Sequence, residues 1–352
     1  MLDLPDIAPP DDSLRAALRE KIDTRTKPPG SLGRLEELAL EAGLIQGTLA
    51  PAVRDPQLVI FAADHGITAE GVSPYPKEVT PQMVLNFLGE GAAANALARS
   101  AAVGVTVVDA GVAFDFDAAK LPAGGPRFVR DPAGPGTGNF AREDAMTLEQ
   151  LAHALALGRR LAREAVASGS NVLAAGDMGI GNTATAAMLH GLLTDTDPAQ
   201  CAGRGTGLDD AGLAKKQAVL RHARERLPAA VDAQTALRVC GGFEIAAMAG
   251  FFLEGAAQKA LLIIDGYIAG AALLAAVRLR PAVRSFAVFA HRSAEQGHSD
   301  LLKALDARPL LDLDLRLGEG TGAVLAVSLL RSACAFLNEM ASFADAGVAD
   351  RE

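Results

Sequence analysis

Residues 171–186 read Asn171-Val-Leu-Ala-Ala-Gly-Asp-Met-Gly-Ile-Gly-Asn-Thr-Ala-Thr-Ala186. A short apolar run stops at Gly176 and Asp177, two closely spaced glycines follow, and Asn182-Thr183 begin an alanine-rich helical pattern. The stretch therefore predicts a buried strand, a glycine-containing turn and a helix. Glycines let the backbone approach a ligand closely, and the N-terminus of a helix offers unpaired N–H groups to an anion. We expect a phosphate site here, in a protein that handles a phosphorylated metabolite.

Four other apolar runs of strand length also end on a polar side chain. They are residues 57–63, 105–108, 260–264 and 285–290, followed by Asp64-His65, Asp109, Asp265 and His291. Helical patterns lie between the runs, at residues 80–98, 147–167, 183–193, 213–226, 243–254 and 268–279. Apolar strands that alternate with helices predict an α/β fold, a Rossmann-like parallel sheet with helices on both faces. Because ligands bind at the carboxyl ends of such strands, the polar strand ends predict a binding crevice.

The amino-acid composition argues against several classes of protein. The 352 residues are 50% hydrophobic and carry 33 basic against 42 acidic side chains, a net charge of −9. Scattered Lys and Arg and few aromatic residues argue against a nucleic-acid-binding surface. The acidic, Pro-rich N-terminus lacks the regions of a signal peptide, and Asp265 interrupts the most apolar run, residues 260–277, so no membrane span is expected. Cys201, Cys240 and Cys334 lie far apart and predict reduced thiols in a cytoplasmic protein.

The two ends of the chain differ from its middle. Residues 13–47 and 320–343 read as helices with no strands between them. We therefore expect an α/β nucleotide-binding domain at residues 48–316 and a small helical domain formed by residues 1–47 and 317–352. Residues 123–138 are rich in Gly and Pro and predict an ordered surface loop.

A dinucleotide-binding fold is an alternative interpretation of the glycine turn. Gly179-x-Gly181-x-x-Ala184 matches the G-x-G-x-x-A pattern. That fold also needs a second strand ending in an acid about 20 residues further on. Here the helix runs instead into residues 194–198, Thr-Asp-Thr-Asp-Pro, which predict a turn. A nicotinamide-dependent dehydrogenase is therefore disfavoured.

Three further motifs could complete a ligand pocket. Gly203-Arg-Gly-Thr-Gly207 can form an anion-binding nest with Arg204, or a flexible loop. Glu319 stands among glycines in residues 317–323, either as a helix cap or beside a flat ligand that lies against the backbone. A Pro- and Gly-rich loop after Asp64-His65 carries Tyr75, which could form an aromatic wall. The histidines lack the spacing of metal ligands, so no metal is expected.

Seven stretches together resemble the nicotinate-nucleotide–dimethylbenzimidazole phosphoribosyltransferases. They are, in order, Lys27-Pro-Pro-Gly-Ser-Leu-Gly-Arg-Leu-Glu36, Ala63-Asp-His-Gly66, Glu70-Gly-Val-Ser73, Gly176-Asp-Met-Gly-Ile-Gly-Asn-Thr183, Gly203-Arg-Gly-Thr-Gly207, His291-Arg-Ser-Ala-Glu295 and Leu317-Gly-Glu-Gly-Thr-Gly-Ala323. The resemblance implies transfer of phosphoribosyl from nicotinate mononucleotide to 5,6-dimethylbenzimidazole, giving α-ribazole 5′-phosphate and nicotinate for the lower ligand of cobalamin. It also implies a homodimer without metal or cofactor, with the active site between the two domains.

The resemblance assigns roles to individual positions. Glu319 is implied to be the general base, with Asp177 as a second carboxylate in the catalytic site. Phosphate and ribose are implied to bind at Gly176, Gly179, Gly181, Asn182, Thr183, Gly203, Arg204, Gly205, Thr206 and Gly207. The aromatic base is implied to bind at Ser73, Tyr75, Gln82, Met83 and Leu317.

Two departures from the family leave questions open. Asp177 stands where relatives often carry Glu, and Lys77 where many carry Gln. The shorter carboxylate leaves open whether Asp177 reaches the substrate, and Lys77 could alter which bases are accepted. Other acceptors (adenine, other benzimidazoles, phenols or water) and a non-catalytic nucleotide-binding protein remain as alternatives.

Overall fold

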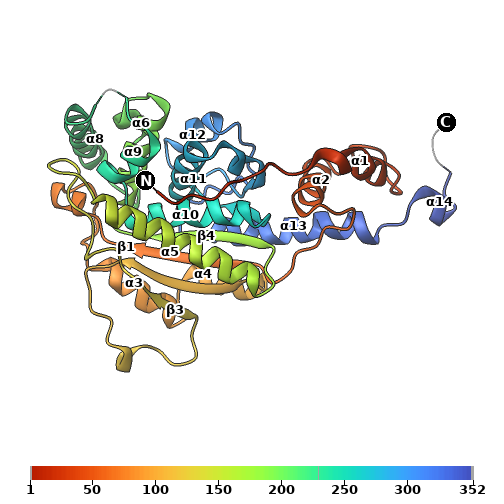
Figure 1. Ribbon diagram of the computed structural model, residues 1–352, viewed down its shortest axis with the longest axis horizontal. Coiled ribbons are helices and arrows are strands. Elements are labelled where there is room, and N and C mark those ends of the chain that lie inside the picture. Colours follow the sequence, from red (N-terminus) through yellow and green to blue (C-terminus); the bar gives the residue numbers. More distant parts are fainter. Residues whose placement is uncertain (1, 229, 350–352) are drawn as a thin grey trace.

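The computed structural model describes residues 2–228 and 230–349 and contains one six-stranded sheet (Figure 1). All of its strand pairs are parallel, in the order β3-β2-β1-β4-β5-β6. The strands are β1 (Gln57–Ala63), β2 (Gly104–Gly111), β3 (Arg127–Arg130), β4 (Val172–Met178), β5 (Leu261–Ile264) and β6 (Ala287–Phe289). The predicted α/β class is confirmed. Because the chain order reverses between β1 and β4, a crevice is expected where these two strands end.

One strand was not predicted. β3 lies within residues 123–138, which we expected to be a loop, and that expectation was wrong for Arg127–Arg130. β3 is an edge strand that pairs only with β2 among the described residues, and its two arginines begin and end it. Such a strand has no continuous apolar run, because only one of its edges and little of its surface is buried.

Helices cover both faces of the sheet, and glycines bring two of them unusually close. α5 (Leu148–Ala167) packs against α10 (Phe243–Ala257), which in turn contacts β1, β2, β4 and β5. A Cβ atom at Gly158 would lie 1.8 Å from the carbonyl oxygen of Ala247, so only glycine allows this approach. In Figure 1, α5 and α10 lie on one side of the strands and α3 (Val79–Leu88) and α4 (Ala93–Ser100) on the other.

The predicted helix at residues 80–98 is two helices, because the chain turns between α3 and α4. Gly89 and Gly91 flank Glu90, whose φ of 59° is incompatible with a continuous right-handed helix. The other helices that carry or support the site are α6 (Asn182–Thr194), α7 (Pro198–Cys201), α8 (Asp210–Glu225), α9 (Ala233–Cys240), α11 (Tyr267–Leu279), α12 (His298–Ala304) and α13 (Thr321–Glu339).

Helices from the N-terminal and C-terminal regions of the chain pack together at one end of the molecule. α1 (Arg15–Asp23) packs on α2 (Arg34–Gln46), and α2 packs on α13 (Figure 1). The N–H of Thr26 donates to the carbonyl of Ala341 at 3.1 Å, and the N–H of Phe343 donates to the carbonyl of Thr24 at 3.1 Å. These hydrogen bonds join segments more than 300 residues apart in sequence.

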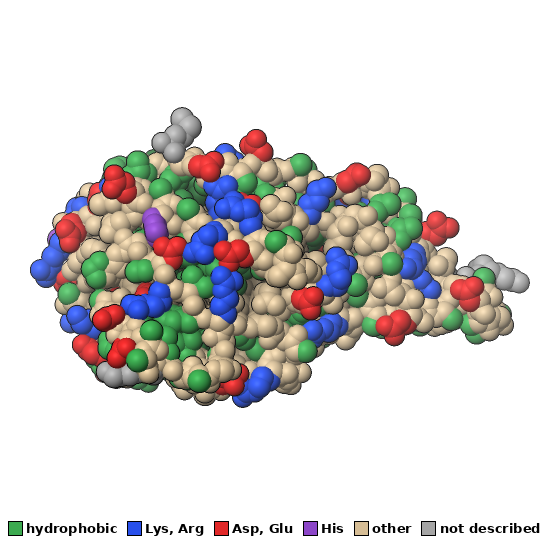
Figure 2. All heavy atoms as spheres, turned by 60° about the horizontal axis from the view of Figure 1, so that its bottom comes forward, with side chains coloured by type: hydrophobic (Ala, Val, Ile, Leu, Met, Phe, Trp, Pro, Cys, Tyr) green, Lys and Arg blue, Asp and Glu red, His purple; other side chains and the backbone are tan. Residues whose placement is uncertain are grey.

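Among the described residues, α13 alone is long and apolar enough to cross a membrane by length and composition. Of its most apolar window, 56% is buried inside the molecule, where the helix contacts α2, α4 and the sheet. The three cysteines are buried and free. Acidic and basic side chains are mixed over the face shown in Figure 2, in keeping with the scattered Lys and Arg of the sequence.

Candidate active site

Two adjoining cavities open at the carboxyl edge of the sheet. The first, which we call the polar cavity, is lined by Asp177, Asn182, Thr183, Gly205, Thr206, Asp265, Gly266, Tyr267, Ile268, His291, Ser293, Glu295, Arg316, Leu317 and Gly318. The second, the apolar cavity, is lined by Tyr75, Val79, Met83, Met178, Ile180, Thr206, Asp314, Leu315, Arg316, Leu317 and Glu319. Thr206, Arg316 and Leu317 belong to both. A ligand with one polar and one aromatic part could therefore occupy both cavities at once.

The apolar cavity has the size and lining for flat aromatic rings. Its volume is about 590 Å³, and Met83, Met178, Ile180 and Leu317 supply apolar walls. Tyr75 and Leu317 are half exposed, at 50% and 55%, and so lie where the cavity meets solvent. Pockets of this kind bind rings by burying their faces, while few polar groups set the orientation.

Glu319 places a buried carboxylate on the wall of the apolar cavity. The side chain is 5% exposed, and its Oε2 accepts the N–H of Ala94 at 3.2 Å, at the N-terminus of α4. Burial raises the pKa of Glu319; the Ala94 N–H opposes this shift and the charge of Asp265 adds to it. A carboxylate with a raised pKa beside a dry, flat cavity is suited to accept a proton from a ring nitrogen.

Asp177 lies at the end of β4 on the wall of the polar cavity. Its Oδ2 accepts a hydrogen bond from Nδ2 of Asn182 at 2.8 Å, at the start of α6. Burial, the charge of Asp265 and that of Glu244 raise the pKa of Asp177 to about 8. In the unliganded protein, Asp177 is therefore mostly protonated at neutral pH and can donate a hydrogen bond.

Lys216 supplies positive charge behind the polar cavity, and it was not among the predicted site residues. Its side chain is fully buried, and Nζ donates to Oγ1 of Thr183 at 2.8 Å and to the carbonyl of Gly203 at 3.1 Å. Burial lowers the pKa of Lys216 to about 8. The signal that could have identified Lys216 is the Lys215-Lys216 pair. This pair lies on α8, the helix that follows the second glycine motif.

The glycines of the first motif face the protein interior. A Cβ atom at Gly179 would lie 2.6 Å from the carbonyl oxygen of Ala63 and 3.0 Å from Nε2 of His65. One at Gly181 would lie 2.9 Å from Cγ2 of Thr68. These two glycines therefore make room for the chain around His65.

His65 itself is fixed by two buried hydrogen bonds. Its Nε2 lies 2.7 Å from Oε1 of Glu244, and its Nδ1 lies 2.9 Å from Oγ1 of Thr185 on α6. This arrangement ties the end of β1 to the start of α6 and so supports the turn that carries Asp177 and Asn182.

The predicted residues divide into those that line a cavity and those that do not. Asp177, Asn182, Thr183 and Gly205 line the polar cavity, Tyr75, Met83 and Glu319 line the apolar cavity, and Thr206 and Leu317 line both. Gly176, Gly179, Gly181, Gly203, Arg204, Gly207, Ser73 and Gln82 are not among the lining residues. Gln82 is exposed, Arg204 pairs with Asp210, and Oγ of Ser73 accepts the N–H of Tyr75 at 3.2 Å. Contact of these residues with a ligand stays a prediction.

Several cavity residues were missing from the predicted set. Asp265 and His291 are polar strand ends, and Ser293 and Glu295 belong to the motif that follows His291, so the sequence did contain a signal for them. Met178 and Ile180 lie within the first glycine motif, which was a signal for them, whereas Val79, Leu315 and Arg316 carry no such signal because only the fold defines their positions.

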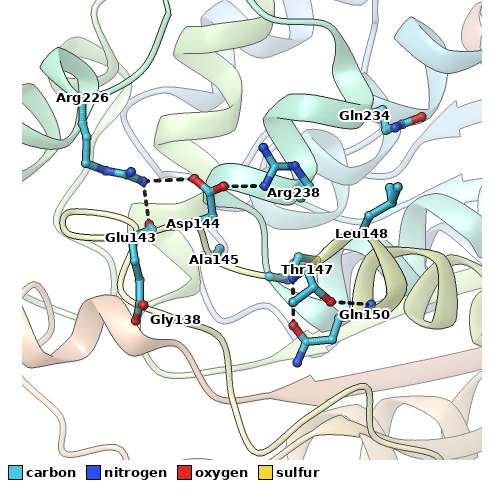
Figure 3. A pocket seen from close by; sticks show the side chains of 11 residues that line it. Gly138, Glu143, Asp144, Ala145, Thr147, Leu148, Gln150, Arg226, Gln234 and Arg238 are labelled. Carbon is cyan, nitrogen blue, oxygen red and sulfur yellow. Dashed lines mark hydrogen bonds and ion pairs between the residues drawn. The ribbon is translucent and has the colours of Figure 1, made fainter.

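A larger cavity of about 900 Å³ lies elsewhere, beside the start of α5 (Figure 3). None of the predicted site residues lines it. Arg226 and Arg238 both pair with Asp144, and Thr147 and Gln150 bond to each other's backbone as a helix cap. Its charged groups are thus largely satisfied within the protein, and we place the candidate active site at the two adjoining cavities.

Known proteins resemble this chain over nearly its full length. A family model described as a phosphoribosyltransferase matches residues 7–348. Nicotinate-nucleotide–dimethylbenzimidazole phosphoribosyltransferase from Ralstonia nicotianae is 52% identical over 349 residues, which cover 98% of this chain and 97% of that protein. The enzyme of the same name from Dechloromonas aromatica is 51% identical over 352 residues, covering 99% of each chain.

Solved structures are similar over the same length. A crystal structure of nicotinate-nucleotide–dimethylbenzimidazole phosphoribosyltransferase from Thermus thermophilus matches with a TM-score of 0.90 at 43% identity, covering 97% of this chain and 100% of that chain. The resemblance inferred from the seven sequence motifs is thereby confirmed. The chain belongs to the nicotinate-nucleotide–dimethylbenzimidazole phosphoribosyltransferase family.

Proposed function

We propose that the protein transfers the phosphoribosyl group of nicotinate mononucleotide to 5,6-dimethylbenzimidazole, with Glu319 as the general base. One observation carries the proposal: the buried Glu319 carboxylate faces a cavity suited to flat rings, and that cavity adjoins one backed by Lys216. Family membership and the names of the relatives support the same reaction. The products are α-ribazole 5′-phosphate and nicotinate.

The reaction needs a base but no acid. The bond between C1′ and the pyridinium nitrogen breaks, and its electron pair stays on that nitrogen, so nicotinate leaves with a neutral ring. A benzimidazole nitrogen forms the new bond to C1′ from the opposite face, which converts the β-nucleotide into an α-product. The attacking ring becomes cationic, and Glu319 removes the proton from its other nitrogen.

Binding both reactants in adjoining cavities supplies the rest of the catalysis. Alignment of two bound reactants replaces a bimolecular encounter and accounts for a large share of the rate. We assign the phosphate to the part of the polar cavity lined by Thr183 and Gly205, where the Lys216 ammonium lies behind Thr183 and supplies positive charge. Asp177, mostly protonated before substrate binds, is placed to donate a hydrogen bond to the ribose.

The test is Glu319→Gln, which preserves shape and removes the base. We expect kcat to fall by about 10²- to 10⁴-fold, the usual range for one acid–base group, with little change in KM for nicotinate mononucleotide. Glu90→Gln, at an exposed glutamate near α4, is the control and should leave kcat unchanged. A Glu319→Gln enzyme within about threefold of the wild-type kcat would refute the assignment.

The acceptor is tested separately, with a panel of 5,6-dimethylbenzimidazole, other benzimidazoles, adenine and phenols, and with water as the competing acceptor. Faster turnover of another acceptor would replace dimethylbenzimidazole in the proposal. No turnover with any of them would favour a nucleotide-binding protein without catalysis.

We also propose a division into two domains, at residues 48–316 and at residues 1–47 with 317–352, and a cytoplasmic homodimer that works without metal or cofactor. The packing of α1 and α2 beside α13 supports the domain division. The exposure of Tyr75, Leu313 and Leu317 near the apolar cavity supports a partner subunit there. Light scattering on the purified protein tests the dimer, and a monomer at assay concentration would exclude it.

A further inference from the structure

Asp265 is a buried carboxylate that no feature of the proposed reaction has used. It directly follows β5 and is 2% exposed. Its Oδ1 accepts the N–H of Ala323 at 2.8 Å, and the N–H groups of Gly320 and Gly322 lie near enough to lower the pKa of this carboxyl. Asp265 therefore caps the N-terminus of α13, which has no side-chain cap of its own.

The segment that Asp265 caps carries Glu319. Gly318, Glu319 and Gly320 have φ values of 83°, 62° and 83°, so three consecutive residues adopt the left-handed conformation. Glycine takes this conformation readily, but glutamate does not, and such strain persists only where the surroundings hold it. The backbone that Asp265 holds, through the Ala323 N–H, is the first turn of the helix that follows Glu319, and the Gly320 N–H directly after Glu319 also lowers the pKa of Asp265.

We propose that Asp265 is a positioning residue, which holds the Glu319 carboxylate against the apolar cavity by clamping the backbone that follows it. This inference rests on the proposed role of Glu319 as the base. It gives this buried carboxylate a role: Oδ1 accepts the Ala323 N–H of α13, which would otherwise be left unpaired, while Oδ2 has no hydrogen-bond partner among the described residues.

Other ionisable groups also face this site. Asp177 comes from β4, Glu244 from α10, and His291 follows β6 with its Nε2 3.7 Å from Oδ1 of Asp265. Burial raises the pKa of Asp265, while His291 and the three N–H groups lower it. A negative charge on Asp265 in turn raises the pKa of Glu319. The hydrogen bonding of Asp265 to the backbone and its negative charge therefore both act on the Glu319 carboxylate.

Two substitutions of Asp265 distinguish the effect of its hydrogen bonding to the backbone from the effect of its negative charge. Asp265→Ala removes both, and we expect kcat to fall by about 100-fold, as for a misplaced catalytic group, with the KM for nicotinate mononucleotide within about threefold of wild type. Asp265→Asn keeps an oxygen that can accept the Ala323 N–H. It should give an intermediate kcat, and the acidic limb of its pH–rate profile should move to lower pH because the pKa of Glu319 falls.

Asp109 provides a matched control. It also follows an apolar strand core and caps backbone, accepting the N–H groups of Gly111 at 3.1 Å and Val112 at 2.8 Å, but it lines neither cavity. Asp109→Ala should lower the melting temperature while leaving kcat unchanged. An equal loss of kcat in Asp109→Ala and Asp265→Ala would show that removing any buried capping aspartate disturbs the structure enough to lower kcat. That result would overturn the inference.

The remaining outcomes are also decisive. Should Asp265→Ala fail to fold, Asp265→Asn decides: a wild-type kcat together with an unmoved acidic limb would overturn the inference. Glu319→Gln, measured in parallel, separates the two proposals. Full turnover by Glu319→Gln refutes the proposed base, whereas an impaired Glu319→Gln beside a fully active Asp265→Ala refutes only the role of Asp265.

Discussion

The backbone of Glu319 passes so close to Gly176 that a Cβ atom at residue 176 would lie 2.3 Å from the Glu319 carbonyl oxygen and 2.5 Å from its carbonyl carbon. Real Cβ contacts are essentially never this short, so only glycine permits the approach. Gly176 belongs to β4, and Glu319 lies two residues before the start of α13. Gly176 of the first motif therefore makes room for the backbone of Glu319, the proposed base, in the last motif.

Gly176→Ala should displace Glu319 and impair catalysis more than substrate binding. We expect kcat to fall by about 100-fold, because a shift of about 1 Å in a catalytic group costs that much. Steady-state kinetics at saturating substrate measure the effect. Gly158→Ala is the matched control, since its Cβ would lie 1.8 Å from the Ala247 carbonyl but far from either cavity lining. It should lose stability, by about 1–3 kcal/mol or more, without losing kcat in the folded fraction.

Lys216→Met should weaken binding of the nucleotide phosphate. The buried ammonium bonds to Thr183 on the polar cavity, and a hydrogen bond to a charged group contributes about 1.5–3 kcal/mol, or about 10- to 100-fold in KM for nicotinate mononucleotide. Lys215→Met, at the exposed neighbouring lysine, should leave KM unchanged. Equal KM values for the two variants would contradict a phosphate role for Lys216.

Asp177→Asn should change how stability depends on pH. The pKa of Asp177 is raised from 3.8 to about 8, so the folded chain keeps a proton that the unfolded chain releases. Stability contributed by this group is complete at low pH and is lost as pH rises toward the folded pKa. The melting temperature of Asp177→Asn relative to wild type should therefore increase between about pH 4 and about pH 8. If the melting temperatures of Asp177→Asn and wild type change with pH in the same way across that range, the pKa of Asp177 is not raised.

Arg316→Gln should reduce discrimination between donors. Arg316 is exposed and lines both cavities, so its guanidinium can meet the ring carboxylate of nicotinate. Loss of that charged contact should lower the preference for nicotinate mononucleotide over nicotinamide mononucleotide, in kcat/KM, by about tenfold or more. Arg292→Gln, whose arginine pairs with Asp312 at 2.6 Å, should keep the wild-type ratio. An unchanged ratio in Arg316→Gln would assign carboxylate recognition to another group.

The sheet could be predicted because buried parallel strands are apolar along their whole length. The apolar run at residues 57–63 predicts a strand and forms β1 with the same bounds. β3 could not be predicted, since an edge strand of four residues between Gly and Pro has no such run. The break at Gly89 was also missed, because the apolar pattern of α3 and α4 continues across it.

The sequence could not predict which glycines of the motifs line the candidate site. In sequence, Gly179, Gly181 and Gly205 all look like parts of a phosphate loop. Gly205 does line the polar cavity, but Gly179 and Gly181 pack around Ala63, His65 and Thr68. The residues that pack against Gly179 and Gly181 lie more than 100 residues away in the chain. A local sequence pattern therefore cannot predict whether these glycines face a ligand or the protein interior.

The order of residues was enough to predict the fold class and the family, and it indicated the edge of the sheet where we propose that ligand binds, because apolar strands must be buried and their polar ends must leave the core. How that edge works depends on packing in three dimensions. The fold brings Gly176 and Asp265 to the backbone around Glu319, and Lys216 to Thr183. Each of these relationships joins strands, loops and helices distant in the chain, and depends on close packing between them, which a linear pattern of residues does not contain.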